Sequence, residues 1–308
     1  MRRERGFALI AALWLLVAIS ALTLEVSLVA RDRRLAAANT VETAQARAAA
    51  DAGLEHARAR LVALLGPARQ GILDPWRQPD SLFPGDVTLG DVRYHVALRD
   101  AGSALNLNRA TETELRRFFM ALRVDAGKAD RLAQAIMDWR DPDDLRRARG
   151  AEREDYLRDG SPVLPRNGPF QSVAELAGVQ GMTPEILDLA RPYLTLLGTG
   201  QVNLNAAPRP VLLALPGIGE EAAGVVLRRQ QARRPIRTLA ELSVELSSGA
   251  RAALQAEMAT LLGRVAFETR EVEAVSDGWM EGSPVRARDR GLLVRARDVA
   301  FLVWRRAE

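Results

Sequence analysis

Apolar residues gather near the start of the chain, in an uninterrupted run from Phe7 to Leu24. The run is 18 residues long and uncharged. As a helix it would extend roughly 27 Å, close to the thickness of a bilayer's hydrocarbon core. A membrane anchor and a cleaved secretory signal both fit such a run, but the apolar region of a signal usually has only about 7–15 residues. The length favours a retained anchor over residues 7–30.

The helical pattern continues past the anchor through residues 31–66, which are rich in alanine and contain no proline. Apolar side chains recur there on one helical face, at Leu54, Ala57, Leu61 and Leu65. A Gly-Pro pair at positions 66–67 ends the pattern, because glycine can adopt the left-handed cap and proline cannot continue a helix. The sequence therefore predicts a stem helix that lies against a globular head.

Strand-like alternation appears in two regions that are far apart, residues 86–99 and a region that begins at Arg264. Both carry charged residues at alternate positions, as antiparallel strands with one wet face do. The intervening residues 103–263 are mostly helical in pattern. The predicted fold is α+β: the long N-terminal helix packs on a small antiparallel β-sheet formed by residues 67–102 and 264–308, and residues 103–263 form a large helical insertion.

The insertion contains an internal repeat. The tetrapeptide at residues 105–108 (LNLN) recurs at residues 202–205 (VNLN), 97 residues later. The octet at residues 169–176 recurs at residues 235–242, 66 residues later, and each copy has a capping-box pattern that opens a helix. The insertion is therefore predicted to be two related units, residues 103–201 and 202–263, with a loop at residues 138–168 grafted into the first.

The second unit contains a glycine-rich hairpin, made of Leu215, Pro216, Gly217, Ile218 and Gly219. This segment resembles the helix-hairpin-helix motif of DNA repair proteins and competence DNA receptors, in which backbone N–H groups hold a phosphate. Glu220 and Glu221 follow the hairpin directly, where a phosphate would have to approach. We therefore expect the two units to be of the helix-hairpin-helix or SAM-like type, with a structural hairpin and no bound nucleic acid.

The grafted loop is rich in carboxylates. Asp138, Asp141 and Asp143 occur at positions i, i+3 and i+5, and Pro142 bends the chain between them. Several carboxylate oxygens directed at one point are what calcium requires. The same loop is crowded with arginines, so a surface loop held by ion pairs is the alternative.

Composition narrows the possible functions. Lys128 is the only lysine among 43 basic residues, and the net charge is only +4, which does not suggest a nucleic-acid binder. Cysteine is absent, which excludes disulfides and thiolate metal sites. His56 and His95 are the only histidines, too few for a multi-histidine metal centre. We find no nucleophile motif, P-loop or dinucleotide fingerprint, so we expect the protein not to be an enzyme.

The N-terminus resembles that of type IV prepilin-class proteins, with a basic leader, residues 1–6, that ends in Gly6 and precedes Phe7. In that class a prepilin peptidase cuts after the glycine and methylates the new N-terminal residue, which would here be Phe7. Most members have glutamate at the fifth mature position, where this chain has Ala11. The K-type minor pseudopilins of type II secretion characteristically lack this glutamate. The loop pattern DWxDxDD…GAExxxY, which starts at Asp138, also resembles the K type.

The resemblance covers nearly 80% of the chain and implies a function. A K-type pseudopilin is anchored in the inner membrane by a single span, with its N-terminus in the cytoplasm and its head in the periplasm. Its expected partners are the I- and J-type minor pseudopilins at the pseudopilus tip, the inner-membrane secretion platform and the prepilin peptidase. It is needed to initiate the pseudopilus and to export folded proteins across the outer membrane.

The resemblance also implies calcium near the acidic loop. The expected ligands are Asp138, Asp141, Asp143, Glu152, Asp155 and Asn167. The alternative function is a membrane-anchored helix-hairpin-helix protein for DNA binding or uptake. The missing glutamate at mature position five and the acidic pair after the hairpin favour the pseudopilin.

Overall fold

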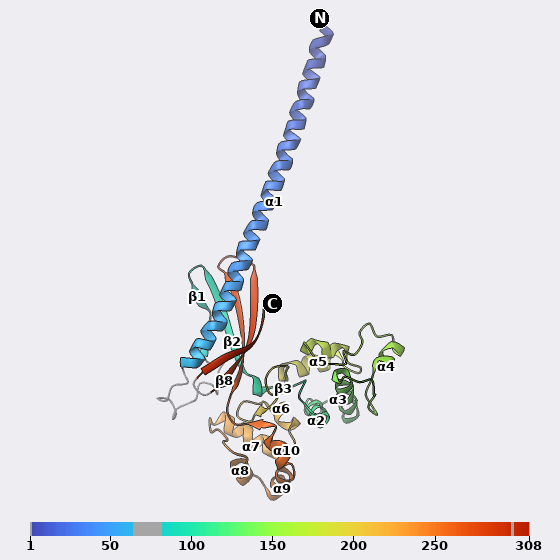
Figure 1. Ribbon diagram of the computed structural model, residues 1–308, viewed down its shortest axis with the longest axis vertical. Helices are drawn as coiled ribbons and strands as arrows, with labels where there is room; N and C mark the ends of the chain where they lie inside the picture. Colours follow the sequence, from blue (N-terminus) through green and yellow to red (C-terminus); the bar gives the residue numbers. More distant parts are fainter. Residues whose placement is uncertain (1, 64–81, 297–298, 308) are drawn as a thin grey trace.

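The computed structural model describes residues 2–63, 82–296 and 299–307, with side chains from residue 12 onward. A long helix, α1 (Arg2–Ala63), projects from a globular head. The head combines a β-sheet that packs on the end of α1 with a helical domain at the far end of the molecule (Figure 1). The predicted α+β architecture is confirmed.

Helix α1 has two distinct parts. An 18-residue window within it has a mean hydropathy of 2.1 and is not buried at all, so this helix is long and apolar enough to cross a membrane. Hydroxyl groups in this part donate to the carbonyl four residues earlier, for example from Ser20 to Leu16 at 2.8 Å and from Ser27 to Thr23 at 2.7 Å. These bonds satisfy the hydroxyl groups inside the helix, as hydrocarbon requires.

The second part of α1 lies on the sheet. Leu54, Ala57 and Leu61 are buried there, as the helical spacing predicted, whereas Leu65 is outside the described residues. These three side chains share a core with Tyr94, Val96, Leu98 and Leu293 of the sheet. The stem is thus held to the head by one apolar face.

Within residues 82–296 and 299–307 the sheet has five antiparallel strands in the order β1-β2-β7-β8-β9. Its strands are β1 (Val87–Leu89), β2 (Val92–Asp100), β7 (Glu271–Met280), β8 (Arg286–Ala296) and β9 (Val299–Ala307). β2 pairs with β7 from Val92↔Met280 to Asp100↔Val272, so the whole helical domain leaves and re-enters the sheet between two neighbouring strands.

Helix α1 approaches β7 closely at Gly278. A Cβ atom built on Gly278 would lie 2.3 Å from the backbone nitrogen of Ala50 and 2.4 Å from the carbonyl oxygen of Ala46. Both contacts are with helix backbone, which cannot rotate away. Glycine is therefore required at this position for the stem to reach the sheet.

The inserted domain consists of short helices and four two-residue strands. The helices of the first unit are η4 (Ala101–Ser103), α2 (Glu112–Ala121), α3 (Ala126–Arg140), α4 (Arg153–Arg158), η5 (Val173–Gly178), α5 (Pro184–Ala190) and η6 (Arg191–Tyr193). Those of the second unit are α6 (Arg209–Ala214), α7 (Glu220–Gln231), α8 (Leu239–Val244), α9 (Ser248–Ala256) and α10 (Met258–Leu262). The strands form two parallel pairs, β3 (Leu105–Asn106) with β4 (Leu194–Thr195) and β5 (Val202–Asn203) with β6 (Val265–Ala266).

The pairing of β6 corrects one expectation. The second strand region was expected to enter the main sheet from Arg264, but Val265 and Ala266 pair with β5 inside the helical domain, and the sheet resumes only at Glu271. Ser172 likewise caps a 3₁₀ helix, η5, rather than an α-helix. Two-residue strands and single turns have too few residues to show a period, so the sequence pattern could not distinguish them.

The internal repeat is visible in matching hydrogen bonds. In the first unit Asn108 accepts from the N–H of Phe170 at 2.8 Å and donates to its carbonyl at 2.9 Å. In the second unit Asn205 makes the same two bonds to Ile236, both at 2.8 Å. Phe170 and Ile236 are the second residues of the two octets aligned from sequence. The tetrapeptide and the octet of each unit are thus joined directly, which explains why both recur.

Buried polar contacts fix the helical domain to the sheet. Asp100, at the end of β2, accepts from Asn203 at 2.6 Å, from Thr269 at 2.5 Å and from the N–H of Gly102 at 2.8 Å. Arg264, just before β6, forms a two-bond ion pair with the buried Glu114 of α2, at 2.7 and 2.9 Å. These contacts span both units and the strand that leads into them, so the orientation of the helical domain is set by the fold.

Candidate metal centre

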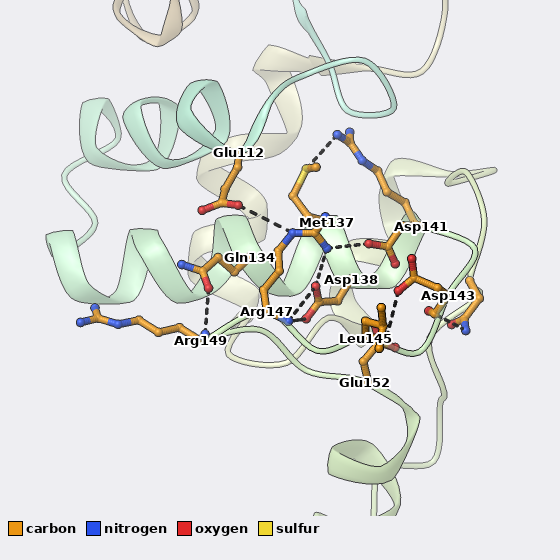
Figure 2. A network of polar contacts seen from close by, with 12 residues as sticks. Glu112, Gln134, Met137, Asp138, Asp141, Asp143, Leu145, Arg147, Arg149 and Glu152 are labelled. Carbon is orange, nitrogen blue, oxygen red and sulfur yellow. Dashed lines mark hydrogen bonds and ion pairs between the residues drawn. The ribbon is translucent and has the colours of Figure 1, made fainter.

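The acidic loop begins where α3 ends and is tied down at both ends. The guanidinium of Arg140 donates to the carbonyls of Leu107 and Ala110, which anchors the end of α3 to the first tetrapeptide. The N–H of Arg149 donates to the side-chain oxygen of Gln134 at 2.8 Å, which returns the loop to the side of α3. The loop therefore folds back over the last turns of α3 (Figure 2).

Asp138 lies beneath this loop and is fully buried. Arg147 binds it twice, because its guanidinium donates to Oδ1 at 2.6 Å and its backbone N–H donates to Oδ2 at 3.2 Å. The same guanidinium nitrogen donates to Oδ2 of Asp141 at 2.5 Å (Figure 2). Burial raises the pKa of Asp138, and the bonds from Arg147 oppose that rise. Asp138 is thus held by an arginine on the inner side of the loop.

Asp141 also belongs to a group of three carboxylates, which lies on the other side of Asp141 from Arg147 and is called the outer side of the loop. Oxygen atoms of Asp141, Asp143 and Glu152 all lie within 4.8 Å of one another. Glu152 is only 4% exposed, yet among the described residues neither of its carboxylate oxygens has a hydrogen-bond partner, and Oδ1 of Asp141 has none either. Buried carboxylate oxygens without a donor are costly unless a cation or a proton compensates them.

The pKa of Glu152 reflects these missing hydrogen-bond donors. Its pKa is raised to about 7, first by burial and then by the negative charges of Asp138, Asp141 and the two aspartates that follow Pro142. Each of these causes raises the pKa of Glu152, whereas Asp138 is stabilised by the guanidinium of Arg147. Three clustered oxygen donors of this kind are the ligands that calcium prefers.

Besides Asp138, two more of the expected ligands, Asp155 and Asn167, lie outside this cluster. Asp155 accepts from the N–H of Glu152 at 3.1 Å and from Arg158 at 3.0 Å, so it opens α4, and the bond from Glu152 lowers its pKa. Asn167 donates to the carboxylate of Asp144 at 2.8 Å and to the carbonyl of Asp143 at 3.3 Å. Its role in the structure is to brace the loop behind Asp143.

Arg147 is the site residue that sequence reasoning missed. The loop has several arginines, and the sequence gives no reason to single out this one. Arg146 and Arg158 ion-pair with Asp155, and Arg149 pairs with Asp130 at 3.2 Å. Of the expected ligands, Asp141, Asp143 and Glu152 come together on the outer side, and Arg147 joins Asp138 to Asp141 on the inner side.

The glycine-rich hairpin connects α6 to α7. Leu215 and Ile218 are fully buried, and Gly217 has a φ of 71° and lies against the backbone of Leu254 in α9. Glu220 pairs with Arg209, and Glu221 accepts from the N–H of Ser247 at 2.6 Å. The hairpin therefore packs against a neighbouring helix, and two carboxylates flank the start of α7.

The processing residues Gly6 and Phe7 both lie within the helical backbone of α1. They are near the end of the molecule that is farthest from the head (Figure 1).

Comparison with known proteins identifies relatives of this chain. Residues 96–199, which include the acidic loop, match the family model of type II secretion system (T2SS) protein K. Type II secretion system protein K of Klebsiella pneumoniae is 30% identical over 234 residues, which are 69% of this chain and 70% of the relative. The putative type II secretion system protein K of Escherichia coli K12 is 30% identical over 143 residues, 42% of each chain.

A solved structure has the same fold. A chain of the GspK-GspI-GspJ complex from the type 2 secretion system of enterotoxigenic Escherichia coli matches with a TM-score of 0.68. The match covers 88% of this chain and 99% of that chain, at 18% identity. The structural match shows the fold, and the 30% identity to the Klebsiella pneumoniae protein over 69% of this chain shows the family: this chain belongs to the family of type II secretion system protein K.

Proposed function

We propose that this protein caps the tip of the periplasmic pseudopilus, where it initiates the fibre and is required for the export of folded proteins. The observation that carries the proposal is the position of the helical domain, at the end of the head that is farthest from the N-terminus of α1 (Figure 1). A further subunit stacked above the sheet in a fibre would meet this domain. A subunit of this shape suits the end of a fibre better than its middle.

The exposed stem supports assembly with other pseudopilins. Leu35 and Val41 lie beyond the predicted span and remain 54% and 56% exposed. Exposed apolar side chains on a bare helix favour packing against neighbouring helices. The matched solved structure is a complex named for three proteins, GspK, GspI and GspJ. We infer that the partners of this chain are the I- and J-type minor pseudopilins, together with the inner-membrane secretion platform, and that its role is mechanical rather than catalytic.

Deleting the gene should abolish secretion through this system, and supplying the full-length protein should restore it. The measurement is the amount of the system's substrates in the culture medium relative to the periplasm. Unchanged export in the deletion strain would contradict the proposal. If the deletion instead abolished DNA uptake while export continued, the alternative DNA-uptake function would be supported.

We further propose that prepilin peptidase cuts between Gly6 and Phe7 in the cytoplasm and methylates Phe7, leaving a single span in the inner membrane. A Gly6→Leu variant should stay at precursor length, because the peptidase accepts only a small residue before the cut. Mass spectrometry of the mature N-terminus should find methylated Phe7. Mature protein that retains Met1, or that starts near Ala21, would contradict this processing.

We also propose that the outer side of the acidic loop binds calcium through Asp141, Asp143 and Glu152. The unpartnered oxygens of Glu152 and Asp141 support this, because a divalent cation would balance them. When bound, the ion supplies positive charge that turns the repulsion among these carboxylates into attraction. Asp138 and Asp155 hold the ends of the loop in place, and Asn167 braces its rim.

A further inference from the structure

Arg147 occupies the inner half of the acidic cluster. One guanidinium nitrogen lies 2.6 Å from Asp138 and 2.5 Å from Asp141, and the guanidinium also approaches Glu112 at 3.7 Å. Figure 2 shows this side chain reaching from the loop to Asp138 and Asp141, on the side away from Asp143. One positive group therefore serves two of the carboxylates that were expected to bind metal.

We propose that Arg147 is a built-in cation of this cluster, which neutralises Asp138 and one oxygen of Asp141 and leaves a single position for a metal ion, at Asp141, Asp143 and Glu152. The position of the metal ion rests on the calcium site proposed above, whereas the role of Arg147 does not. Asp141 is shared, because its Oδ2 binds Arg147 and its Oδ1 has no partner.

The surroundings of Asp138 leave no room for an ion. The loop backbone covers this carboxylate so closely that a Cβ atom built on Gly150 would lie 1.8 Å from its Oδ2. The N–H of Arg147 already donates to that oxygen, and the guanidinium donates to Oδ1. A fully buried carboxylate requires a compensating partner, and here the chain itself provides it.

Arg147 should also change how strongly the loop responds to calcium. With half of the cluster neutralised by a tethered group, the loop is already folded over α3 before a metal ion arrives. Calcium then has to order only the outer half of the loop, and pre-organisation of this kind lowers the cost of binding. Without Arg147 the loop should depend on calcium much more strongly.

The test is the melting temperature of the full-length protein in detergent, first in excess chelator. Arg147→Gln should lower it by about 5 °C or more, because the buried Asp138 loses its partner. Arg149→Gln is the matched control, since it removes the same charge from the same loop but breaks only a pair that solvent reaches, in which Arg149 is 57% exposed, and it should melt within about 1 °C of wild type. Asp138→Asn combined with Arg147→Gln should recover most of the loss, because both charges are then gone.

Equal melting temperatures for Arg147→Gln and Arg149→Gln would overturn the proposal. A double variant as unstable as the sum of its single variants would also overturn it, since lost packing would then explain the effect. If the Arg147→Gln protein is too unstable to accumulate in cells, accumulation of the double variant supports the proposal. If neither variant accumulates, the proposal is contradicted.

A second arm adds calcium to the same proteins. The rise in melting temperature should be larger for Arg147→Gln than for wild type. If wild type binds no calcium, the calcium proposal fails, while the measurements in chelator still decide the role of Arg147. The failures of the two proposals are therefore distinguishable.

Discussion

Alanine at position 278 should separate the stem helix from the sheet and lower the free energy of unfolding by about 3 kcal/mol or more. The added Cβ would lie 2.3 Å and 2.4 Å from backbone atoms of α1, so the whole helix has to move. Such a shift opens the core that Leu54, Ala57 and Leu61 share with the sheet. Chemical denaturation of the full-length protein, followed by near-ultraviolet circular dichroism, measures the loss.

Two other glycines serve as controls for this prediction. Gly85→Ala should be nearly neutral, because no atom of the residues that the structure describes lies within 4 Å of its added Cβ. Gly53→Ala should cost less than Gly278→Ala, because its shortest contact, at 2.1 Å, is with the hydroxyl of Ser276, which can rotate. Alanine is also a better helix former than glycine by about 1 kcal/mol, which offsets part of the strain. If all three variants unfold alike, the close approach of α1 and β7 is not what Gly278 provides.

Calcium should raise the melting temperature of the wild-type protein, and chelator should lower it again. An ion that binds only the folded state at 100 times its dissociation constant stabilises that state by about 2.7 kcal/mol. For a domain of this size the rise is about 5–10 °C. Asp141→Asn combined with Asp143→Asn should abolish the rise, because two of the three clustered carboxylates are then neutral. Calorimetric titration should give one calcium ion per chain.

The Glu152→Gln variant tests whether Glu152 is a metal ligand or a residue that stabilises the loop without metal. In chelator this variant should melt no lower than wild type, because it removes a buried carboxylate whose oxygens have no donor. In calcium it should lose most of the stabilisation. A variant that is unstable in chelator, or one that keeps the full calcium response, would contradict the assignment of Glu152.

The calcium response should also depend on pH. The pKa of Glu152 is raised to about 7 by burial and neighbouring aspartates, above its ordinary value of 4.5. In chelator the ionised form therefore costs stability, a cost that is absent below about pH 4.5 and fully present above about pH 7. Because a ligand carboxylate must be ionised, calcium should bind more tightly at pH 8 than at pH 6. Equal affinities at the two pH values would argue against Glu152 as a ligand.

Much of the fold could be predicted from regular patterns. The anchor and stem follow from one long apolar helix, and the alternation around Tyr94 and Val96 indicates a half-buried strand. The internal repeat can be recognised because its polar residues make fixed hydrogen bonds: Asn108 and Asn205 each bind the second residue of the related octet. A repeated contact of this kind leaves a repeated sequence.

Other features could not be predicted, because they depend on the folded path of the loop. Arg147 and Arg149 differ by two positions, yet one binds the buried Asp138 and the other the half-buried Asp130 on α3. No spacing rule separates them, since the partner is chosen by how residues 141–150 fold back over α3. The same path takes Asp155 out of the carboxylate cluster and places it at the start of α4.

The proposal that this chain is a tip pseudopilin is tested most directly by its complex in the membrane. The full-length protein, co-expressed with the I- and J-type minor pseudopilins of the same genome, should be solubilised in detergent and purified through a tag on this chain alone. The account predicts that both partners copurify in equal amounts. Recovery of this chain without either partner, while the partners accumulate normally in the same membranes, would contradict it.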